Sequence, residues 1–437
     1  MPAKTMGLAT GATPAVSPDP GGRKRRVVVT GIGIVTSTGI GREAVWASAV
    51  AGRSGAGPIT HFDASRHVTK FACQANDFDP VAYMDHRSAR RMDRFAQLAV
   101  AAGKMAVEDA KLPVAAGGSD RIGVIVASGV GGLQTFEDQV AVLLERGPTR
   151  VSPLFIPMMI PNMGAAQVSM ALKFRGPLSC PVTACASGNH AIGDTLEVIR
   201  RGHADAMLAS GAEAAITPIS IAAFNSMKAL STRNGDPTTA SRPFDTGRDG
   251  FVMGEAGAVL VLEELGHAED RGADIWCEVV GYGMSGDAHH LTEPDPTGHA
   301  PALAMRMAME DGDIAPEEVD YINVHGTSTP VGDPSEIRVI QKALGEELAA
   351  KVAVSSTKSM HGHCLGATGG VEAALGAMAI RENTIPPTIN LHDLDPTCVG
   401  VDHVANTARR TQVEVVLSNG FGFGGHNATI ALRRYSG

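Results

Sequence analysis

The sequence is poor in several features, and each shortage excludes a class of function. Aromatic residues make up 4% of the 437 residues, and the formal net charge is −9. Nucleic-acid binding needs a positive face and, for single strands, stacking side chains, so we expect no nucleic-acid partner. No apolar run reaches the roughly 18 to 20 residues that cross a bilayer, so we expect no membrane insertion.

Cysteines are also few: six occur, without a CxxC pair or a regular spacing. This pattern argues against a disulfide framework and a structural zinc site, so we predict no metal centre and reduced thiols in the cytoplasm. Residues 1–25 are rich in Pro, Gly, Ala and Thr and contain no apolar signal-peptide core. We expect residues 1–25 to form a disordered extension.

Helical patterns alternate with short apolar runs through most of the chain. The N-terminal part predicts strands at 27–34, 121–127 and 204–209 and helices at 94–110 and 186–201. The C-terminal part predicts helices at 300–311, 334–344 and 367–381 and strands at 319–324, 351–355, 413–417 and 428–433. Alternation of this kind is typical of an α/β fold with parallel or mixed sheets that are buried on both faces.

Two segments of the chain resemble each other. Residues 27–34 and 277–284 both contain β-branched residues followed by Gly-x-Gly, and a charged helical stretch at 263–272 lies before the second segment. The chain is long for one simple domain. We therefore predict a duplicated unit, with an N-terminal half at 26–276 and a C-terminal half at 277–437.

Cys185 is the first candidate for chemistry. An apolar run at 176–182 stops just before Cys185, and a helix-compatible run of small residues follows it. We therefore expect the thiol to lie where a strand ends and a helix begins. Free backbone N–H groups and the helix dipole favour a thiolate there, which makes Cys185 a candidate nucleophile.

Three further segments carry polar residues at junctions between predicted elements. His325 follows a predicted strand, at the end where α/β folds place ligands. Lys358 and His363 lie in the second segment, 356–372, and the third, 419–427, is rich in glycine. Together with Cys185, these segments predict one active site.

These segments carry a family resemblance that runs from about residue 27 to the C-terminus. The motifs are Thr-Ala-Cys-Ala-Ser-Gly (183–188), His-Gly-Thr-Ser-Thr (325–329), Lys-Ser-Met-x-Gly-His (358–363) and Gly-Phe-Gly-Phe-Gly-Gly-x-Asn (420–427). Leu-Ser-Thr-Arg-Asn (230–234) and Arg-Pro-Phe-Asp-x3-Asp-Gly-Phe (242–251) accompany them. The chain resembles the β-ketoacyl-[acyl-carrier-protein] synthases, most closely the elongating enzymes of bacterial type II fatty-acid synthesis. The resemblance implies a thiolase-like fold: two pseudo-symmetric βαβαβ halves in five α-β-α-β-α layers, and a homodimer.

The resemblance also implies a reaction, a decarboxylating Claisen condensation of acyl and malonyl groups carried on acyl-carrier protein. Cys185 would accept the acyl chain, and the backbone N–H groups of Cys185 and Phe423 would form the oxyanion hole. His325 and His363 would polarise the malonyl thioester and handle protons. Lys358 and Glu372 would support His363. No cofactor is implied beyond the phosphopantetheine that carries the substrates, although a structural monovalent cation fits the family.

Further residues match binding positions of the family. The phosphopantetheine contacts would be Thr292, Thr327 and Thr329. The acyl pocket would use Val130, Phe155 and Phe224, with Phe423 as its gate, and residues 155–160 would shape its far end across the dimer interface. The basic residues that attract the acidic carrier protein would be Arg87, Arg90 and Arg91 on one helical face, together with Arg150 and Lys228.

Alternatives remain open. A ketosynthase of polyketide or very-long-chain (mycolate-type) synthesis would share the motifs, and His426 matches actinobacterial relatives that elongate very long chains. His361 also departs from the Thr that close relatives often carry. A thiolase would use a second cysteine, for which Cys364 is available, but the paired histidines disfavour it. A non-catalytic chain-length factor would generally have lost Cys185. The sequence leaves open the chain length, the saturation and the division of labour between the histidines.

Overall fold

The computed structural model describes residues 24–437. The predicted extension at 1–25 lies outside this range except for Lys24 and Arg25, which form ion pairs with Asp311 and with Asp205. None of the helices within the described residues has both the length and the hydrophobicity that a membrane span requires.

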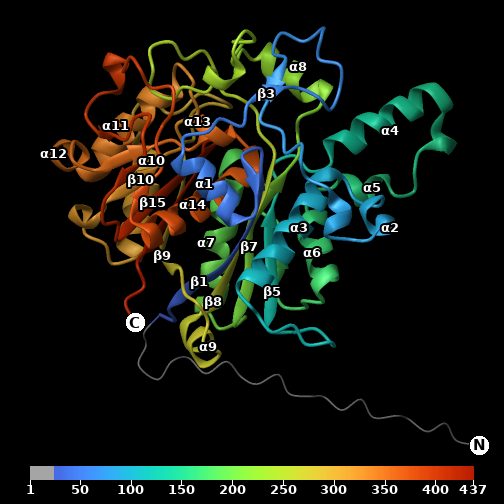
Figure 1. Cartoon of the computed structure of the whole chain (residues 1–437), viewed down its shortest axis with the longest axis horizontal. Helices are drawn as coiled ribbons and strands as arrows, with labels where there is room; N and C mark the ends of the chain where they lie inside the picture. Colours follow the sequence, from blue (N-terminus) through green and yellow to red (C-terminus); the bar gives the residue numbers. More distant parts are fainter. Residues whose placement is uncertain (1–23) are drawn as a thin grey trace, which may run out of the picture.

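Each half of the chain forms one sheet, and the two sheets have the same strand arrangement (Figure 1). The N-terminal sheet has the order β1-β8-β7-β5-β6, and the C-terminal sheet has the order β9-β16-β15-β10-β11-β13. In each sheet the second strand is antiparallel to both neighbours, and the strands beyond it run parallel. A short pairing of β1 with β9 joins the sheets. The repeated order confirms the prediction of pseudo-symmetric halves.

The strands of the N-terminal sheet are β1 (Val27–Thr36), β5 (Ile122–Ala127), β6 (Leu178–Ser179), β7 (Ala206–Glu213) and β8 (Ala256–Glu264). Those of the C-terminal sheet are β9 (Cys277–Gly286), β10 (Tyr321–Asn323), β11 (Ala353–Ser355), β13 (Asp402–His403), β15 (Val415–Gly422) and β16 (His426–Arg433). The short strands β2 (Gly39–Ile40), β3 (Gly57–Pro58), β4 (Phe71–Ala72), β12 (Thr384–Ile385) and β14 (Arg409–Arg410) lie in connections. The predicted division at residues 276 and 277 stays a prediction, and β9 begins at Cys277.

Helices cover and separate the sheets. The central layer is α7 (Ser187–Arg200) and α14 (Thr368–Glu382), whose apolar residues share one core with strands of both sheets. α3 (Arg94–Asp109) and α6 (Met163–Leu172) pack on the outer face of the N-terminal sheet. α10 (His299–Asp311) and α11 (Gly332–Leu344) pack on the outer face of the C-terminal sheet. These five layers are the thiolase-like arrangement that the resemblance implied.

The remaining helices lie in connections. They are α1 (Arg42–Val50), α2 (His86–Ala89), α4 (Leu133–Arg146), α5 (Phe155–Met159), α8 (Pro218–Ser226), α9 (Leu265–Asp270), α12 (Glu346–Ala349) and α13 (Lys358–His361). The charged helix predicted at 263–272 is shorter than expected, because β8 continues to Glu264. Glu263 is fully buried there and accepts hydrogen bonds from Thr30 and His267.

The repeated Gly-x-Gly has a packing reason. A Cβ atom on Gly33 of β1 would lie 1.9 Å from the carbonyl oxygen of Ala102 in α3. A Cβ atom on Gly283 of β9 would lie 2.0 Å from the carbonyl oxygen of Ala304 in α10. Each half therefore uses glycine to bring an outer helix against its sheet, and the sequence echo reflects this shared contact.

Candidate active site

Cys185 lies in a single 3₁₀ turn, Ala184–Ala186, directly before α7. The turn is held by Ser187, whose hydroxyl accepts from the N–H of Thr183 at 2.8 Å and donates to the carbonyl of Ala184 at 2.6 Å. Ala184 has a φ of 50°, a left-handed value that tilts the following residue out of a regular helix. The strand expected to run up to the cysteine is wrong, because β6 ends at Ser179 and residues 180–183 are irregular.

The glycine-rich segment lies directly against this turn. A Cβ atom on Gly422 would sit 2.6 Å from the carbonyl oxygen of Thr183 and 3.2 Å from the nitrogen of Cys185. Only glycine therefore fits at residue 422. Phe423 follows it with a side chain that is 37% exposed. The close contact places the backbone of Phe423 beside the sulfur of Cys185.

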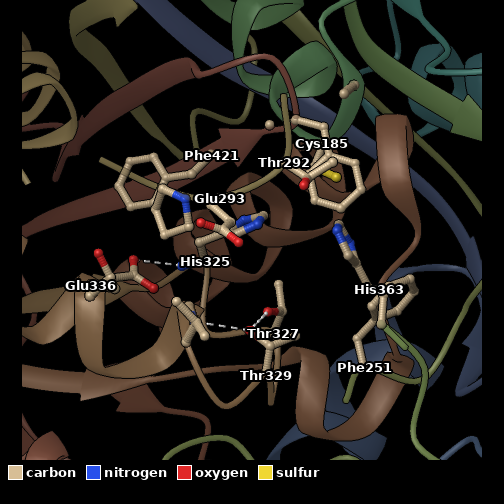
Figure 2. A pocket seen from close by; sticks show the side chains of 18 of the residues that line it. Cys185, Phe251, Thr292, Glu293, His325, Thr327, Thr329, Glu336, His363 and Phe421 are labelled. Atoms are coloured by element: carbon tan, nitrogen blue, oxygen red, sulfur yellow. Dashed lines mark hydrogen bonds between the residues drawn. The ribbon is translucent and has the colours of Figure 1, made fainter. Parts of the chain in front are cut away.

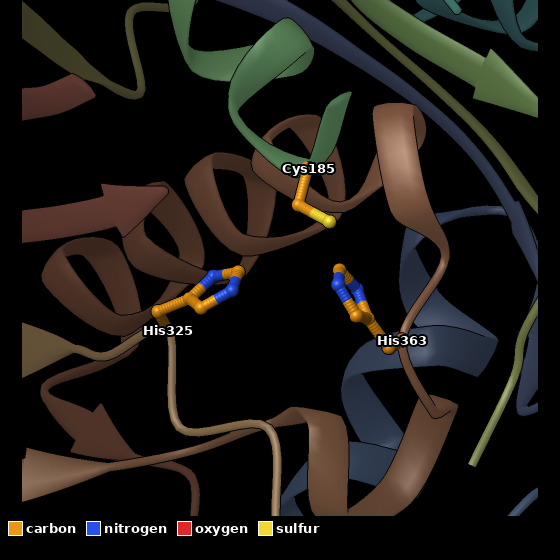
Figure 3. Close-up of side chains that lie close together, drawn as sticks. All are labelled: Cys185, His325 and His363. Carbon is orange, nitrogen blue, oxygen red and sulfur yellow. The ribbon is translucent and has the colours of Figure 1, made fainter. Parts of the chain in front are cut away.

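Two histidines from the other half converge on the sulfur (Figure 3). His325 follows β10, and His363 follows α13. The Sγ atom of Cys185 and one ring nitrogen from each histidine all lie within 4.8 Å of one another. The two rings are 5.3 Å apart between centroids and nearly perpendicular. The structure thus brings together the three residues predicted to carry the chemistry.

Each histidine is held by a different group. Nδ1 of His363 lies 3.0 Å from the hydroxyl of Thr368, so Nε2 is the nitrogen available to a ligand. The backbone N–H of His325 donates to the carboxylate of Glu336 at 2.8 Å. Nδ1 of His325 is buried and has no hydrogen-bond partner among the described residues.

The site environment keeps both imidazoles neutral. Burial lowers the pKa of His325 and of His363 well below the usual value, and the positive charge of Lys358 lowers both further. Each ring also lies beside another histidine that opposes its protonation. Neutral rings can donate a hydrogen bond to a developing enolate oxygen without protonating the carbanion.

Burial is also the largest influence on the pKa of the Cys185 thiol. It raises the pKa of Cys185 to about 12, although Lys358 and the backbone N–H groups of Phe423 and Cys185 act in the opposite direction. The expectation that the helix start favours a thiolate is therefore wrong. Desolvation of the sulfur outweighs the N–H groups and the nearby cation.

Lys358 and Glu372 form an ion pair that is fully buried behind the histidines. The Lys358 ammonium also donates to the carbonyl of Val324 at 3.3 Å. Burial raises the pKa of Glu372 to about 8, while Lys358 opposes this shift. Lys358 acts on the histidines through its charge, whereas the hydrogen bond to the His363 ring comes from Thr368.

A cavity of about 600 Å³ is lined by Cys185, His325 and His363 (Figure 2). Its lining includes these predicted residues: Thr292, Thr327, Thr329, Val130, Phe224, Phe423 and Lys228. Phe155 does not line it, because α5 carries this ring against Phe136, at 6.1 Å between centroids.

The predicted docking residues are all exposed. They are Arg87, Arg90, Arg91, Arg150 and Lys228. The single helical face expected for the first three is wrong, because α2 ends at Ala89, so Arg90 caps it and Arg91 follows it. The two unusual histidines differ in environment. His361 is buried with Nε2 3.0 Å from the Thr357 hydroxyl, and His426 is exposed.

Several residues that shape the site were not predicted from the sequence. Two buried carboxylates of α11 accept hydrogen bonds from backbone N–H groups of the 325–329 segment. Asp333 accepts from Ser328 and Thr329, and Glu336 accepts from His325 and Gly326. Glu336 falls within the helix predicted at 334–344, whereas Asp333 lies just before it, because the observed helix begins two residues earlier, at Gly332.

Arg248 lies on the other side of the same segment. It donates to the carbonyls of Thr329 at 3.0 Å and Pro330 at 3.1 Å, and it pairs with Asp395 at 2.7 Å. Arg248 occupies an unspecified position of the 242–251 motif, so the motif did not predict this role. Thr368 also had no signal in its sequence context.

Profiles of two families match the chain. The N-terminal domain of β-ketoacyl synthases matches residues 24–268, and the C-terminal domain matches residues 276–392. The chain belongs to the β-ketoacyl synthase family. Its reaction class is therefore acyl transfer by a condensing enzyme.

Curated relatives share about half of their residues with this chain. The 3-oxoacyl-[acyl-carrier-protein] synthase 2 of Synechocystis sp. is 50% identical, over 94% of this chain and 99% of that protein. The protein of the same name from Coxiella burnetii is 48% identical, with the same coverage of both chains. Both alignments cover 94% of this chain.

Solved structures agree on the fold. A β-ketoacyl synthase from Burkholderia phymatum superposes with a TM-score of 0.88 at 37% identity, over 94% of this chain and all of that one. A ketosynthase solved with its type II PKS acyl-carrier protein superposes with a TM-score of 0.86 at 31% identity, over 95% of this chain and all of that one.

Proposed function

We propose that this protein is a 3-oxoacyl-[acyl-carrier-protein] synthase of the type 2 class, which lengthens a fatty acyl chain by two carbons. The observation that carries the proposal is the convergence of Cys185, His325 and His363 within 4.8 Å at the floor of the cavity. One nucleophile and two neutral imidazoles are the groups that the two half-reactions need.

The first half-reaction is acyl transfer. The sulfur of Cys185 attacks the acyl thioester, and the thiol of phosphopantetheine leaves with the proton that Cys185 gives up. The backbone N–H groups of Cys185 and Phe423 form the oxyanion hole, which stabilises the negative oxygen of the tetrahedral intermediate. Both N–H groups oppose the upward shift in the pKa of Cys185, which supports this role.

The second half-reaction forms the new carbon–carbon bond. Malonyl-carrier protein loses CO2, and the resulting enolate carbon attacks the acyl group on Cys185, whose sulfur leaves as the thiol after taking a proton. His325 and His363 donate hydrogen bonds to the enolate oxygen, because both rings are neutral. The buried positive charge of Lys358 helps to keep these rings neutral, and Glu372 pairs with Lys358.

The cavity lining supports the substrate assignments. Thr292, Thr327 and Thr329 contact phosphopantetheine, and Val130 and Phe224 line the acyl pocket behind the gate Phe423. All six line the same cavity.

We extend the proposal to a homodimer in which the α5 segment with Phe155 reaches the pocket of the partner. Ile156 of α5, Leu178 of the edge strand β6 and the nearby Val182 expose their apolar side chains, which supports an interface at these segments.

Acyl-carrier protein is the proposed protein partner, in the cytoplasm. Arg87, Arg90, Arg91, Arg150 and Lys228 form the proposed docking residues, and all five side chains are exposed. Lys228 also lines the cavity, which places a positive charge where the carrier's phosphate would arrive.

A structural monovalent cation remains part of the proposal. The buried oxygens Oε2 of Glu372, Oγ of Ser418 and Oδ1 of Asn189 have no hydrogen-bond partner among the described residues. Oxygen atoms are the ligands that a hard cation prefers, so these three side chains are the candidate ligands.

Two alternatives are weaker. Cys364, the thiol that a thiolase would need, is fully buried and absent from the cavity lining. The ketosynthase with the type II PKS carrier is 31% identical to this chain, against 46–50% for the synthases named 3-oxoacyl-[acyl-carrier-protein] synthase 2.

The test is an elongation assay with malonyl-carrier protein and acyl-carrier proteins of different chain length. Mass spectrometry should find products two carbons longer, with one labelled CO2 released per product. Condensation of acetyl-CoA alone, without malonyl groups, would instead support a thiolase.

A further inference from the structure

The three side chains at the cavity floor are also ligands that zinc favours. A thiol and two imidazoles project from three separate segments toward a common space (Figure 3). Their ligand atoms lie within 4.8 Å of one another. Two ligands of one tetrahedral Zn²⁺ are roughly 3.5 Å apart, since Zn–S is about 2.3 Å and Zn–N about 2.0 Å. A side-chain shift of about 1 Å would therefore complete a Cys-His-His site.

We propose that Cys185, His325 and His363 bind Zn²⁺ or a similar thiophilic divalent cation, and that this binding inhibits the enzyme. The fourth position would face the cavity and hold water, as in zinc sites with three protein ligands. The inhibition rests on the proposed function, whereas the binding rests on the ligand geometry alone.

The ligands are ready to bind a cation. The Thr368 hydroxyl fixes Nδ1 of His363 and leaves Nε2 for the metal. Metal-binding histidines commonly have such a partner on the second ring nitrogen.

The charges around the site also permit a cation. Lys358 is the nearby positive group, and it is paired with Glu372. Glu336 accepts hydrogen bonds from His325, Gly326 and Asn419, and Glu213 accepts from Ser128, Gly129 and Gly366. These hydrogen bonds favour negative charge on both carboxylates, whereas burial opposes it.

The binding step balances without an oxidant. The Cys185 thiol releases its proton to water as the sulfur–zinc bond forms, and both imidazoles bind as neutral ligands. An acylated sulfur carries no proton to lose and is a poor ligand. The metal and the acyl chain therefore compete for the same sulfur, and the metal inhibits the free enzyme alone.

Cobalt titration of the full-length enzyme tests the site directly, because Co²⁺ replaces Zn²⁺ and a Co–thiolate bond absorbs in the near ultraviolet. We expect one Co²⁺ per chain with this absorption, its displacement by Zn²⁺ and no effect of Mg²⁺. Cys185→Ser should abolish the band, and Cys180→Ser, which alters a nearby thiol outside the cluster, should keep it. Thr368→Val should weaken cobalt binding by about tenfold, the cost of losing a hydrogen-bond partner of a ligand.

Inhibition is measured in parallel with Zn²⁺ and reversed with a chelator. We expect loss of condensation for the free enzyme and protection when Cys185 is acylated first. A missing absorption band, or a band that persists in Cys185→Ser, would overturn the inference. Cobalt binding without any condensation in metal-free buffer would instead refute the proposed function and leave the metal site intact.

Discussion

The hydroxyl of Thr368 lies 3.0 Å from Nδ1 of His363. Thr368 is the first residue of α14, whereas His363 lies just before the 3₁₀ turn Leu365–Ala367 that leads into this helix. The helix start thus sets the ring orientation of a histidine five residues away. The buried Lys358, which pairs with Glu372, acts on the same ring through its charge and makes no hydrogen bond to it.

Thr368→Val removes this hydroxyl at nearly constant volume. We expect kcat to fall by about 10- to 100-fold, or roughly 1.4–2.7 kcal/mol, because the ring loses its fixed orientation. The rate of acyl transfer to Cys185 should change little. Steady-state kinetics and single-turnover acylation separate the two effects. Thr368→Ser is the matched control and should retain most of kcat; equal losses in both variants would contradict an orienting role.

The pH dependence of alkylation tests the state of Cys185. Because its pKa is raised to about 12, the thiol is protonated across the neutral range. The iodoacetamide rate should rise about tenfold per pH unit between pH 7 and pH 9, as the thiolate fraction grows. Cys185→Ala gives the background from other thiols. A rate that levels off near pH 7 would show a thiolate in the resting enzyme.

Arg248→Lys removes a guanidinium that donates to the carbonyls of Thr329 and Pro330. Charged hydrogen bonds of this kind contribute about 1.5–3 kcal/mol. We expect kcat/KM for carrier-protein substrates to fall by about 10- to 100-fold, mainly through KM. The reason is that the segment with Thr327 and Thr329, which we propose to contact phosphopantetheine, loses its support. Arg121→Lys is the control, since Arg121 pairs with Asp205 on the surface. A pure kcat effect would contradict this positioning role.

Reversal of Arg87, Arg90 and Arg91 to Glu tests carrier-protein docking. We expect KM for acyl-carrier protein to rise by about tenfold or more at low salt, with kcat nearly unchanged, because the exposed charges attract an acidic partner. Raising the salt concentration should weaken the binding of acyl-carrier protein to the parent enzyme and reduce the difference in KM between parent and variant. Reversal of the exposed Arg175 and Arg201 provides the control. Kinetics equal to the parent would remove these residues from the docking site.

Cys185→Gln places an amide where the acyl thioester would lie. We expect elongation to be lost, while CO2 release from malonyl-carrier protein continues, because His325 and His363 remain in place. Cys185→Ala should also lose elongation. Labelled CO2 and product analysis distinguish the two half-reactions, and normal elongation in either variant would reject the assignment of the nucleophile.

Much of the secondary structure and the division into two related halves could be predicted from local sequence patterns. The helices near 94–110 and 300–311 and the strands near 122–127 and 428–433 follow periodicities that their own residues carry. The Gly-x-Gly repeat predicted two related halves, because each pair of glycines meets an outer helix in the same way. The strand before Cys185 could not be predicted reliably, since β6 is a short edge strand with little pairing to define its length.

The sequence by itself determined which residues are candidates for the chemistry, because Cys185, His325 and His363 lie in motifs whose residue types and order suffice to name them. Tertiary structure alone decided their protonation and support. The pKa of Cys185 depends on how much water the folded chain removes from the sulfur, and the partners of the 325–329 segment are whichever buried groups the fold brings to it. Burial and long-range hydrogen bonding are properties of the packed molecule, and no local stretch of sequence contains them.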